Sequence, residues 1–535
     1  MTPNTFSDAF TRILLLALYF LLLSPVGSVT ARDGDGMAAL IQDALATRPA
    51  AGEIRAFYAD RAFEPLWFAG GRPLPEAKEV AIRIALAGMQ GLDPDDYLSG
   101  LYAGEGPPAS LNETAAAEVD LTETLLRYAA DLHDGRFRPA SVDRKWHIRK
   151  PRLDVTAWLS EAAQAGDIGA RLDALAPPHP VYRDLRRALE EHLSIAAASG
   201  WPAFPQNGPR KLEPGDRHEQ VSLLRRRLAV TDGAAAEALD PENYDPDLVE
   251  AVKRFQRRHG LNDDGVVGRR TRAALAVPVE RRILQLRAAL ERWRWMPADL
   301  GASYVLVNVP AFRLWFYEDG EPTLTMRTIV GKYKRQTPTF AASISYFVLR
   351  PKWYVPRRIA VQDLLPKAQD DPEYYQKGGY TVFDRETGET VDPATVDWTA
   401  YGDGGEFPFR LVQGAGDSNA LGDIKFMFEN PYGVYLHDTS SPRLFLKDHR
   451  TFSSGCIRVE KPLELAAGIL SEDQPTAPET VSAMISKSPK NRYLTLRREV
   501  PLYVVYVTAW ADAEQAYFYD DPYRRDQALL ERIEN

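Results

Sequence analysis

The single cysteine of this chain, Cys456, is the residue best suited to nucleophilic chemistry. It follows Gly455 in the run Ser-Ser-Gly-Cys-Ile-Arg-Val, and His437 closes the apolar run Val-Tyr-Leu nineteen positions earlier. A thiolate is a strong nucleophile, and a neighbouring base or positive charge makes it available by lowering the pKa of the thiol. If the two runs form neighbouring strands, the imidazole reaches the sulfur. We therefore predict a cysteine enzyme with Cys456 as the nucleophile and His437 as the base.

Residues beside this pair could support the same chemistry. Gly455 lets the backbone turn sharply, so that its N–H and that of Cys456 can point at one oxyanion. Arg458 lies two positions after the cysteine and shares its face of a strand, where it could hold a substrate carboxylate or favour the thiolate. We expect Ser454 and Tyr435 to line the same site.

The sequence leaves alternatives open at this site. A lone cysteine can be a small buried core residue, although Ser-Ser-Gly before it and Arg after it would pack poorly in a core. His449 is a rival base, but it lies in the charged run Lys-Asp-His-Arg, which is typical of a solvated loop. Asp438 adjoins His437, yet strand neighbours point to opposite faces, so we expect a backbone carbonyl to orient the imidazole.

The pattern resembles the signature of the L,D-transpeptidases, which cross-link peptidoglycan. That signature is a histidine, a gap, and then Ser/Thr-His-Gly-Cys. His437 and residues 454–458 are similar to it, with Ser454 in place of the second histidine and Arg458 in place of the frequent Asn. Both departures are shared by the large periplasmic subfamily that also has a helical scaffold and a peptidoglycan-binding module.

The resemblance implies a thioester on Cys456, formed from a donor tetrapeptide stem and resolved by the amine of a second stem to give a 3→3 cross-link. It implies no cofactor, and no His/Cys/Asp cluster in the sequence has metal-ligand spacing. The same acyl-enzyme could instead serve an L,D-carboxypeptidase or the attachment of a wall protein. A non-catalytic peptidoglycan-binding scaffold that recruits cell-wall synthesis proteins is the alternative from a different class.

The N-terminus predicts export. Arg12 precedes an apolar run, Ile13–Leu23, and a small-residue cleavage site ends at Ala31, so residues 1–31 are typical of a signal peptide. An uncleaved inner-membrane anchor is the alternative. We expect a periplasmic, wall-associated protein. The net charge of -9 argues against nucleic-acid binding, and one cysteine cannot form an intramolecular disulfide.

Composition and periodicity predict an α+β multidomain protein. Ala- and Leu-rich runs with helical spacing indicate a helical scaffold over residues 32–205, and strand-like runs begin at Tyr304. The family resemblance implies a mostly-β catalytic domain over 303–485, with a lid-like insertion at about 351–407 that covers the site. We expect the strands within 486–535 to complete the catalytic sheet.

Residues 211–277 resemble the small three-helix peptidoglycan-binding module. The matching positions are Phe255, Gln256, Gly260, Leu261, Asp264, Gly265, Gly268, Thr271 and Leu275. Caps, turns and core packing explain most of them, so they identify the module and name no ligand residue. Arginines at 225–227, 254, 257 and 258 form solvated helix faces or contact anionic muropeptides or a partner.

Overall fold

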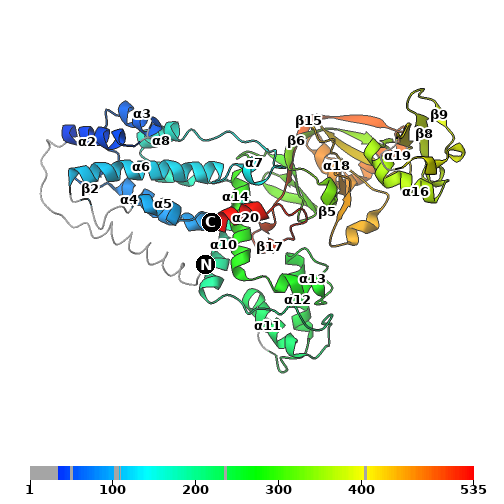
Figure 1. Cartoon of the computed structure of the whole chain (residues 1–535), viewed down its shortest axis with the longest axis horizontal. Helices are drawn as coiled ribbons and strands as arrows, with labels where there is room; N and C mark the ends of the chain where they lie inside the picture. The colour runs from blue at the N-terminus through cyan, green and yellow to red at the C-terminus, as the bar shows by residue number, and fades with distance from the viewer. Residues whose placement is uncertain are drawn as a thin grey trace.

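The motifs predicted to be catalytic lie within a nine-stranded mixed sheet of a computed structural model (Figure 1). The structure describes residues 34–48, 52–101, 108, 110–233, 238–402 and 406–534. The strand order is β13-β5-β14-β12-β11-β6-β15-β3-β4. The strands are β3 (Ser303–Asn308), β4 (Arg313–Glu318), β5 (Glu321–Gly331), β6 (Phe340–Leu349), β11 (Ile424–Phe428), β12 (Leu436–His437), β13 (Thr451–Ser453), β14 (Ile457–Val459) and β15 (Arg492–Val505).

Alternating side chains of this sheet enter two cores. Val305 and Val307 of β3 pack with α18 (Pro462–Ser471) and α19 (Pro478–Lys487) on one face. Leu306, between them, belongs to a second core on the other face, together with α10 (Pro180–Ala197), α14 (Val279–Arg294) and α20 (Gln527–Glu534). The sheet therefore holds the catalytic region and the helical scaffold together (Figure 1).

The helical region predicted within 32–205 is present, and most of it packs around a separate core. Its long helix α6 (Leu111–Asp134) begins at Ser110, whose Oγ accepts a hydrogen bond from the Glu113 N–H at 3.3 Å. The remaining elements are α2 (Gly34–Ala46), α3 (Gly52–Asp60), β1 (Phe68–Ala69), β2 (Arg72–Pro73), α4 (Pro75–Ala85), η1 (Ala87–Gln90), α5 (Asp95–Leu101), α7 (Pro139–Val142), α8 (Val155–Ala165) and α9 (Ile168–Asp173).

The small module folds as α11 (Glu219–Asp232), α12 (Pro246–Arg258) and α13 (Arg269–Leu275) around its own core. The Gln256 amide donates to Asp264 Oδ1 and to the Val266 carbonyl, both at 3.0 Å, and its Oε1 accepts from the Gly265 N–H at 2.9 Å. Gly260 has the positive φ of 61° that its predicted place at the helix end requires. These motif residues thus have structural roles.

The insertion forms a second sheet, of order β7-β10-β8-β9, at the end of the molecule opposite the scaffold (Figure 1). It extends beyond residue 407, where we predicted its end, because β10 (Phe409–Gln413) pairs with both β7 (Trp353–Tyr354) and β8 (Tyr380–Asp384). Its other elements are α15 (Arg357–Ile359), η3 (Ala360–Leu364), α16 (Leu365–Asp370), α17 (Tyr374–Lys377), β9 (Thr390–Val391), η4 (Pro393–Thr395) and η5 (Trp398–Ala400).

The last segment differs in part from the prediction. β15 does complete the sheet, where it pairs with β3 and β6. The second predicted strand does not join it, because β17 (Ala516–Phe518) pairs with β16 (Ala509–Ala511) in a separate hairpin. Trp510 of this hairpin stacks on Trp315 of β4 with ring centroids 4.8 Å apart, so the hairpin packs on the sheet face.

The predicted signal peptide, residues 1–31, lies outside the described residues. Among the helices that the structure does describe, none combines the length and the apolar composition needed to cross a membrane.

One buried asparagine joins the end of β3 to the C-terminal segment, and it provides a test of this arrangement. Asn308 is fully buried; its Nδ2 donates to the Val507 carbonyl at 2.8 Å and its Oδ1 accepts from the Val507 N–H at 3.0 Å. Asn308→Ala leaves both backbone groups unpaired, so we expect a loss of about 2 to 4 kcal/mol in unfolding free energy. Guanidinium denaturation followed by tryptophan fluorescence measures it.

The control for this variant is Asn112→Ala, at an exposed position in the first turn of α6. We expect its unfolding free energy to stay within about 0.5 kcal/mol of the unsubstituted protein. A similarly small change for Asn308→Ala would contradict the structural role of the Asn308–Val507 pair.

Candidate active site

Two strand pairings bring the candidate residues onto one face of the sheet. β12 pairs with β14 in parallel, with His437 opposite Arg458, and with β11 antiparallel, with Lys425 opposite His437. Partners in register share a face, so these three side chains lie together. Leu436 and Ile457 alternate with them and are fully buried in the core of the opposite face.

Cys456 lies immediately before β14, two positions from Arg458, and therefore continues the same face. The Ile457 N–H donates to the Tyr435 carbonyl at 3.1 Å, which places Cys456 beside Tyr435. The Cys456 Sγ donates to the Gly433 carbonyl at 3.7 Å, and the side chain is only half-buried. The sulfur is thus not enclosed in an aliphatic core, as the alternative reading of a structural cysteine required.

The imidazole of His437 is held in one tautomer. Its Nδ1 lies 2.6 Å from the backbone carbonyl of Asp438, and a carbonyl can only accept, so Nδ1 carries the proton and Nε2 has the free lone pair. Asp438 supplies only this backbone oxygen, because its carboxylate accepts from the Asp423 N–H at 2.9 Å. We expected a backbone carbonyl to orient the imidazole, because neighbouring residues of a strand point to opposite faces.

His449 does not belong to this face. It precedes β13, which is separated from β12 by β5 and β14 in the strand order. Its exposed ring contacts Thr451 Oγ1 at 2.9 Å through Nε2 and packs edge-on against Phe312. Of the two candidate bases, His437 is the one whose strand pairs with β14, the strand that begins directly after Cys456.

The site face carries two cations without acidic partners. Among the described residues, no carboxylate lies within 4.0 Å of Lys425 or Arg458. Lys425 Nζ lies 3.8 Å from the ring centroid of Tyr435, and the buried Nε of Arg458 has no hydrogen-bond partner. Sequence reasoning missed Lys425, because only the β11–β12 register shows that it faces His437.

Burial of the site favours neutral forms of the catalytic pair. Burial first, and then the positive charge of Arg458, lower the pKa of His437 to about 3. Burial raises the pKa of the Cys456 thiol, although hydrogen bonds from Tyr435 and the charges of Lys425 and Arg458 oppose the shift. Arg458 acts in favour of the thiolate, as the sequence suggested it could, but desolvation has the larger effect on the pKa of the thiol.

The loop before Cys456 is fixed by its own hydrogen bonds. Gly455 has a φ of 123°, which favours glycine, and its N–H donates to Ser453 Oγ at 3.1 Å. Ser453 Oγ in turn donates to the Cys456 carbonyl at 2.5 Å. Within the described part of the chain, the Cys456 N–H has no acceptor. Of the two oxyanion donors that the sequence predicted, the Cys456 N–H is free and the Gly455 N–H is engaged.

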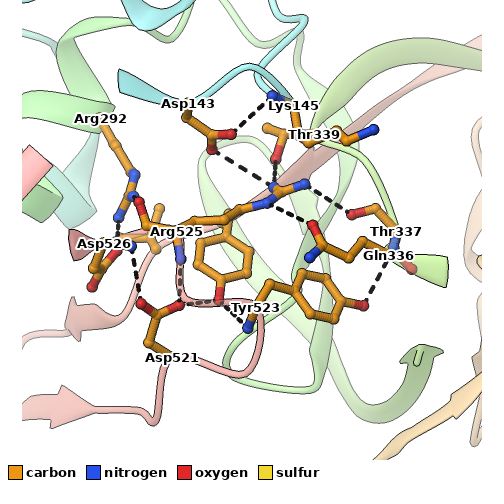
Figure 2. A network of polar contacts seen from close by, with 12 residues as sticks. Asp143, Lys145, Arg292, Gln336, Thr337, Thr339, Asp521, Tyr523, Arg525 and Asp526 are labelled. Atoms are coloured by element: carbon orange, nitrogen blue, oxygen red, sulfur yellow. Dashed lines mark hydrogen bonds and ion pairs between the residues drawn. The ribbon is translucent and has the colours of Figure 1, made fainter. Parts of the chain in front are cut away.

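The C-terminal segment is linked to this loop by hydrogen bonds through Thr337. Thr337 Oγ1 donates to the Gly455 carbonyl at 2.9 Å, and the Thr337 N–H donates to the Tyr523 hydroxyl at 3.3 Å. Figure 2 shows Tyr523 and Arg525 beside Thr337, with Arg525 reaching toward Asp143 of the scaffold, 3.7 Å away. The scaffold, the C-terminal segment and the nucleophile loop are therefore linked by one polar network.

The insertion contacts the site at two points. Tyr435 packs against the core of the insertion and forms a side-chain hydrogen bond with Trp353 of β7. Arg335 donates to Ser454 Oγ at 2.7 Å and forms an ion pair with Asp363 of η3. Ser454 and Tyr435 thus connect Cys456 to the insertion, and both lie at the predicted site.

Comparisons with known families agree with this division of the chain. Residues 302–476 match the family described as "L,D-transpeptidase catalytic domain", 217–275 the "Putative peptidoglycan binding domain" and 52–189 the "Scaffold domain". Among curated proteins, a "Putative L,D-transpeptidase" of Haemophilus influenzae is 38% identical over 225 residues. The match covers 42% of this chain and 45% of that protein, less than half of its length.

Solved structures give weaker likenesses. The L,D-transpeptidase (residues 123–326) from Xylanimonas cellulosilytica is 16% identical at a TM-score of 0.17, over 56% of this chain and 99% of that one. L,D-transpeptidase 1 of Mycobacterium tuberculosis is 15% identical at a TM-score of 0.14, over 38% and 61%. TM-scores this low carry no weight. The three family matches show that this chain combines a catalytic domain of the L,D-transpeptidase family with a scaffold domain and a peptidoglycan-binding domain.

Proposed function

We propose that this chain is an L,D-transpeptidase that forms 3→3 cross-links in peptidoglycan through a thioester on Cys456. The observation that carries the proposal is the parallel β12–β14 pairing, which places His437 and Arg458 side by side next to the cysteine. A half-buried sulfur beside an imidazole with an unprotonated Nε2 is an arrangement for covalent acyl transfer.

The first half-reaction is acylation of the enzyme. As Sγ attacks the carbonyl carbon between the third residue and the terminal D-Ala of a donor tetrapeptide, its proton passes to His437 Nε2. The negative charge that develops on the carbonyl oxygen is stabilised by the free Cys456 N–H. The C–N bond then breaks, His437 returns the proton to the amine of D-Ala, and a thioester remains on Cys456.

The second half-reaction transfers the acyl group. The side-chain amine of a diaminopimelate residue in a second stem attacks the thioester carbonyl and loses its proton to His437. The C–S bond breaks, Sγ takes the proton back, and the free thiol and the cross-linked product are released. Water in place of the amine would give an L,D-carboxypeptidase, and an amine on a protein would give wall attachment.

Protonation states decide how the thiol is activated. Because the pKa of His437 is low and that of Cys456 is raised, the free enzyme holds a neutral thiol and a neutral imidazole. Burial lowers the pKa of His437 most, and the charges of Arg458 and Lys425 lower it further. A substrate carboxylate bound at these two cations would offset their part of the shift. Substrate binding would therefore make His437 a stronger base at the moment of attack.

The remaining assignments follow from the domains. Peptidoglycan stems are the proposed substrates, and the periplasm is the proposed location. The insertion is the proposed lid that holds the stems, through its contacts with Tyr435 and Arg335. A non-catalytic scaffold is the weaker alternative, because it gives no reason for an accessible sulfur beside a tautomer-fixed histidine.

The nucleophile is tested with a disaccharide-tetrapeptide as the substrate and mass spectrometry as the readout. We expect an adduct on Cys456 that lacks one D-Ala, and a cross-linked dimer that also lacks one D-Ala. Cys456→Ala should abolish both species while the protein keeps its circular dichroism spectrum. A dimer formed by Cys456→Ala would exclude the proposed nucleophile, and tripeptide without dimer would favour the carboxypeptidase.

The base is tested by His437→Gln, with His449→Gln as the matched control. Loss of general base catalysis should slow acylation by about 10²- to 10⁴-fold, measured by intact mass against time. His449→Gln should leave the rate within about twofold, because its exposed ring lies outside the site face. Equal effects of the two variants would remove His437 from the mechanism.

The resting protonation state predicts the pH dependence of alkylation by iodoacetamide. Only the thiolate reacts, and burial raises the thiol pKa above its ordinary value of about 8.5. The rate in the free enzyme should therefore rise about tenfold per pH unit from pH 7 to pH 8.5. The alkylation rate of His437→Gln should rise by the same factor, since His437 is neutral throughout that pH range. A plateau below pH 8 would show a resting thiolate instead.

A further inference from the structure

A cavity lies where the peptidoglycan-binding module meets the scaffold and the C-terminal hairpin. Its volume is about 660 Å³, within the range of small-ligand sites, and it is lined from α10, α11, α12, α14 and β17. Figure 1 shows α11–α13 below α10, α14 and β17. None of its lining residues comes from β11, β12 or β14, so it is separate from the catalytic face.

The inner part of this junction cavity holds two buried arginines that lack acidic partners. Arg227 is 2% exposed; its Nε donates to the Leu275 carbonyl at 3.3 Å and its Nη1 has no hydrogen-bond partner. Arg282 is 6% exposed and donates only to Gln285 Oε1 and the Ala274 carbonyl. Among the described residues, no carboxylate lies within 4.0 Å of either guanidinium.

The other buried arginines differ in how they are satisfied. Among the described residues, Arg272 and Arg450 have no carboxylate within 4.0 Å and donate to neutral oxygens instead. Two of the most deeply buried arginines are paired with acids. Arg292 forms an ion pair with Asp526, and Arg294 binds Glu291 at 2.8 Å. Asp232 of α11 already binds Arg254 and Arg258.

An unpaired buried charge is unfavourable. Arg227 and Arg282 differ from Arg272 and Arg450 because they line a cavity, and Nη1 of Arg227 has no hydrogen-bond partner there, so an anion could bind between them.

The charge of the two arginines persists at neutral pH. Burial, followed by the neighbouring charges of Arg282 and Arg258, lowers the pKa of Arg227 to about 9. Burial lowers the pKa of Arg282 to about 9 as well. Both guanidinium groups are thus protonated under physiological conditions, and they repel each other unless an anion lies between or beside them.

Aromatic rings provide apolar contact area beside these charges. The Arg227 guanidinium lies 4.0 Å from the ring centroid of Trp201, and that of Arg282 lies 4.7 Å from that of Phe518. Phe255 also lines the cavity. A ligand with a carboxylate and short aliphatic groups fits these walls better than a bare inorganic anion does.

The rim carries acidic side chains, one of which, Glu191, forms an ion pair with the lining residue Arg187 at 3.9 Å. Glu190 and Glu191 of α10 and Glu514 of the loop between β16 and β17 are exposed and line the opening. His192 is a further lining residue; its Nδ1 contacts the Ala188 carbonyl at 2.7 Å, which leaves an unprotonated Nε2 as an acceptor. A ligand whose carboxylate is inside would place a free amine at these acceptors.

We propose that the junction cavity binds the free end of a peptidoglycan stem peptide, with a carboxylate at Arg227 and Arg282 and an amine at the acidic rim. This inference rests on the proposed function, which makes stem peptides the substrates of the same chain. Such a site would hold the polymer at the module while another stem reacts at Cys456. It also gives the arginine-rich sequence of α11 a specific role, because Arg227 is buried in the cavity while Arg226 is exposed.

The test is calorimetric titration of the full chain with the free tripeptide L-Ala-γ-D-Glu-diaminopimelate, which has no terminal D-Ala to be cleaved. Arg227→Met should weaken binding at one class of sites by at least tenfold. The exposed neighbour provides the matched control, Arg226→Met, for which binding should stay within twofold. The tripeptide with its carboxyl groups amidated should also bind at least tenfold more weakly. Unchanged binding after either the Arg227 substitution or amidation overturns the proposal.

A second variant keeps the test decisive if Arg227→Met does not fold. Ser194 is an exposed lining residue of α10, so Ser194→Trp should fill the opening without disturbing a core. It should abolish the same class of sites, and retained binding overturns the proposal.

Acylation of Cys456 by tetrapeptide, measured in parallel, separates the two proposals. Retained acylation with unchanged binding in Arg227→Met overturns only the cavity site. Absent acylation with binding that Arg227→Met weakens supports the cavity site and overturns the enzymatic proposal.

Discussion

The parallel pairing of β12 with β14 is the interaction on which the rest of the site depends. Each strand is very short, and the pair is held by its outer neighbours β11 and β5. A slip of one residue in either strand would exchange its core face with its site face. Leu436 and Ile457, both fully buried, make that slip costly, because it would place a charged or polar side chain in the core. The hydrophobic core thus fixes where the imidazole and the sulfur lie.

The electrostatics of the site follow from the same register. It gathers Lys425, His437 and Arg458 on one face, and among the described residues no carboxylate lies within 4.0 Å of either cation. Burial first, and then the charge of Arg458, keeps the imidazole of His437 neutral. In the proposed mechanism the substrate supplies the negative charge that this face lacks. A neutral thiol at Cys456 would be less susceptible to oxidation and alkylation, since the thiolate is the reactive form.

Sequence reasoning predicted the parts of this account that depend on local pattern. The run of Ser-Ser-Gly before Cys456 indicated a turn that the φ of Gly455 confirms, and the alternation around His437 predicted the strand and its backbone-oriented imidazole. It could not predict Lys425 or Arg335, because their place at the site depends on the pairing of distant strands and on the insertion. Arg227, which one reading of the sequence placed on a solvated helix face, is buried, because it donates to the Leu275 carbonyl and lies against the rings of Trp201 and Phe255, contacts that no local pattern encodes. The separate hairpin β16–β17 was not predicted for a similar reason. Its apolar residues are equally compatible with a strand at the edge of the main sheet and with the core shared with the scaffold, where they lie.

The state of the His437 ring tests the central claim most directly, because both the register and the electrostatics act on it. Nitrogen-15 NMR of histidine-labelled protein, with the signal assigned from the His437→Gln spectrum, reports which ring nitrogen is protonated and where the ring titrates. The account predicts an Nδ1–H tautomer that stays neutral from pH 8 down to about pH 4, because the pKa of His437 is lowered to about 3. An Nε2–H tautomer, or a titration near the ordinary pKa of about 6.5, would contradict it.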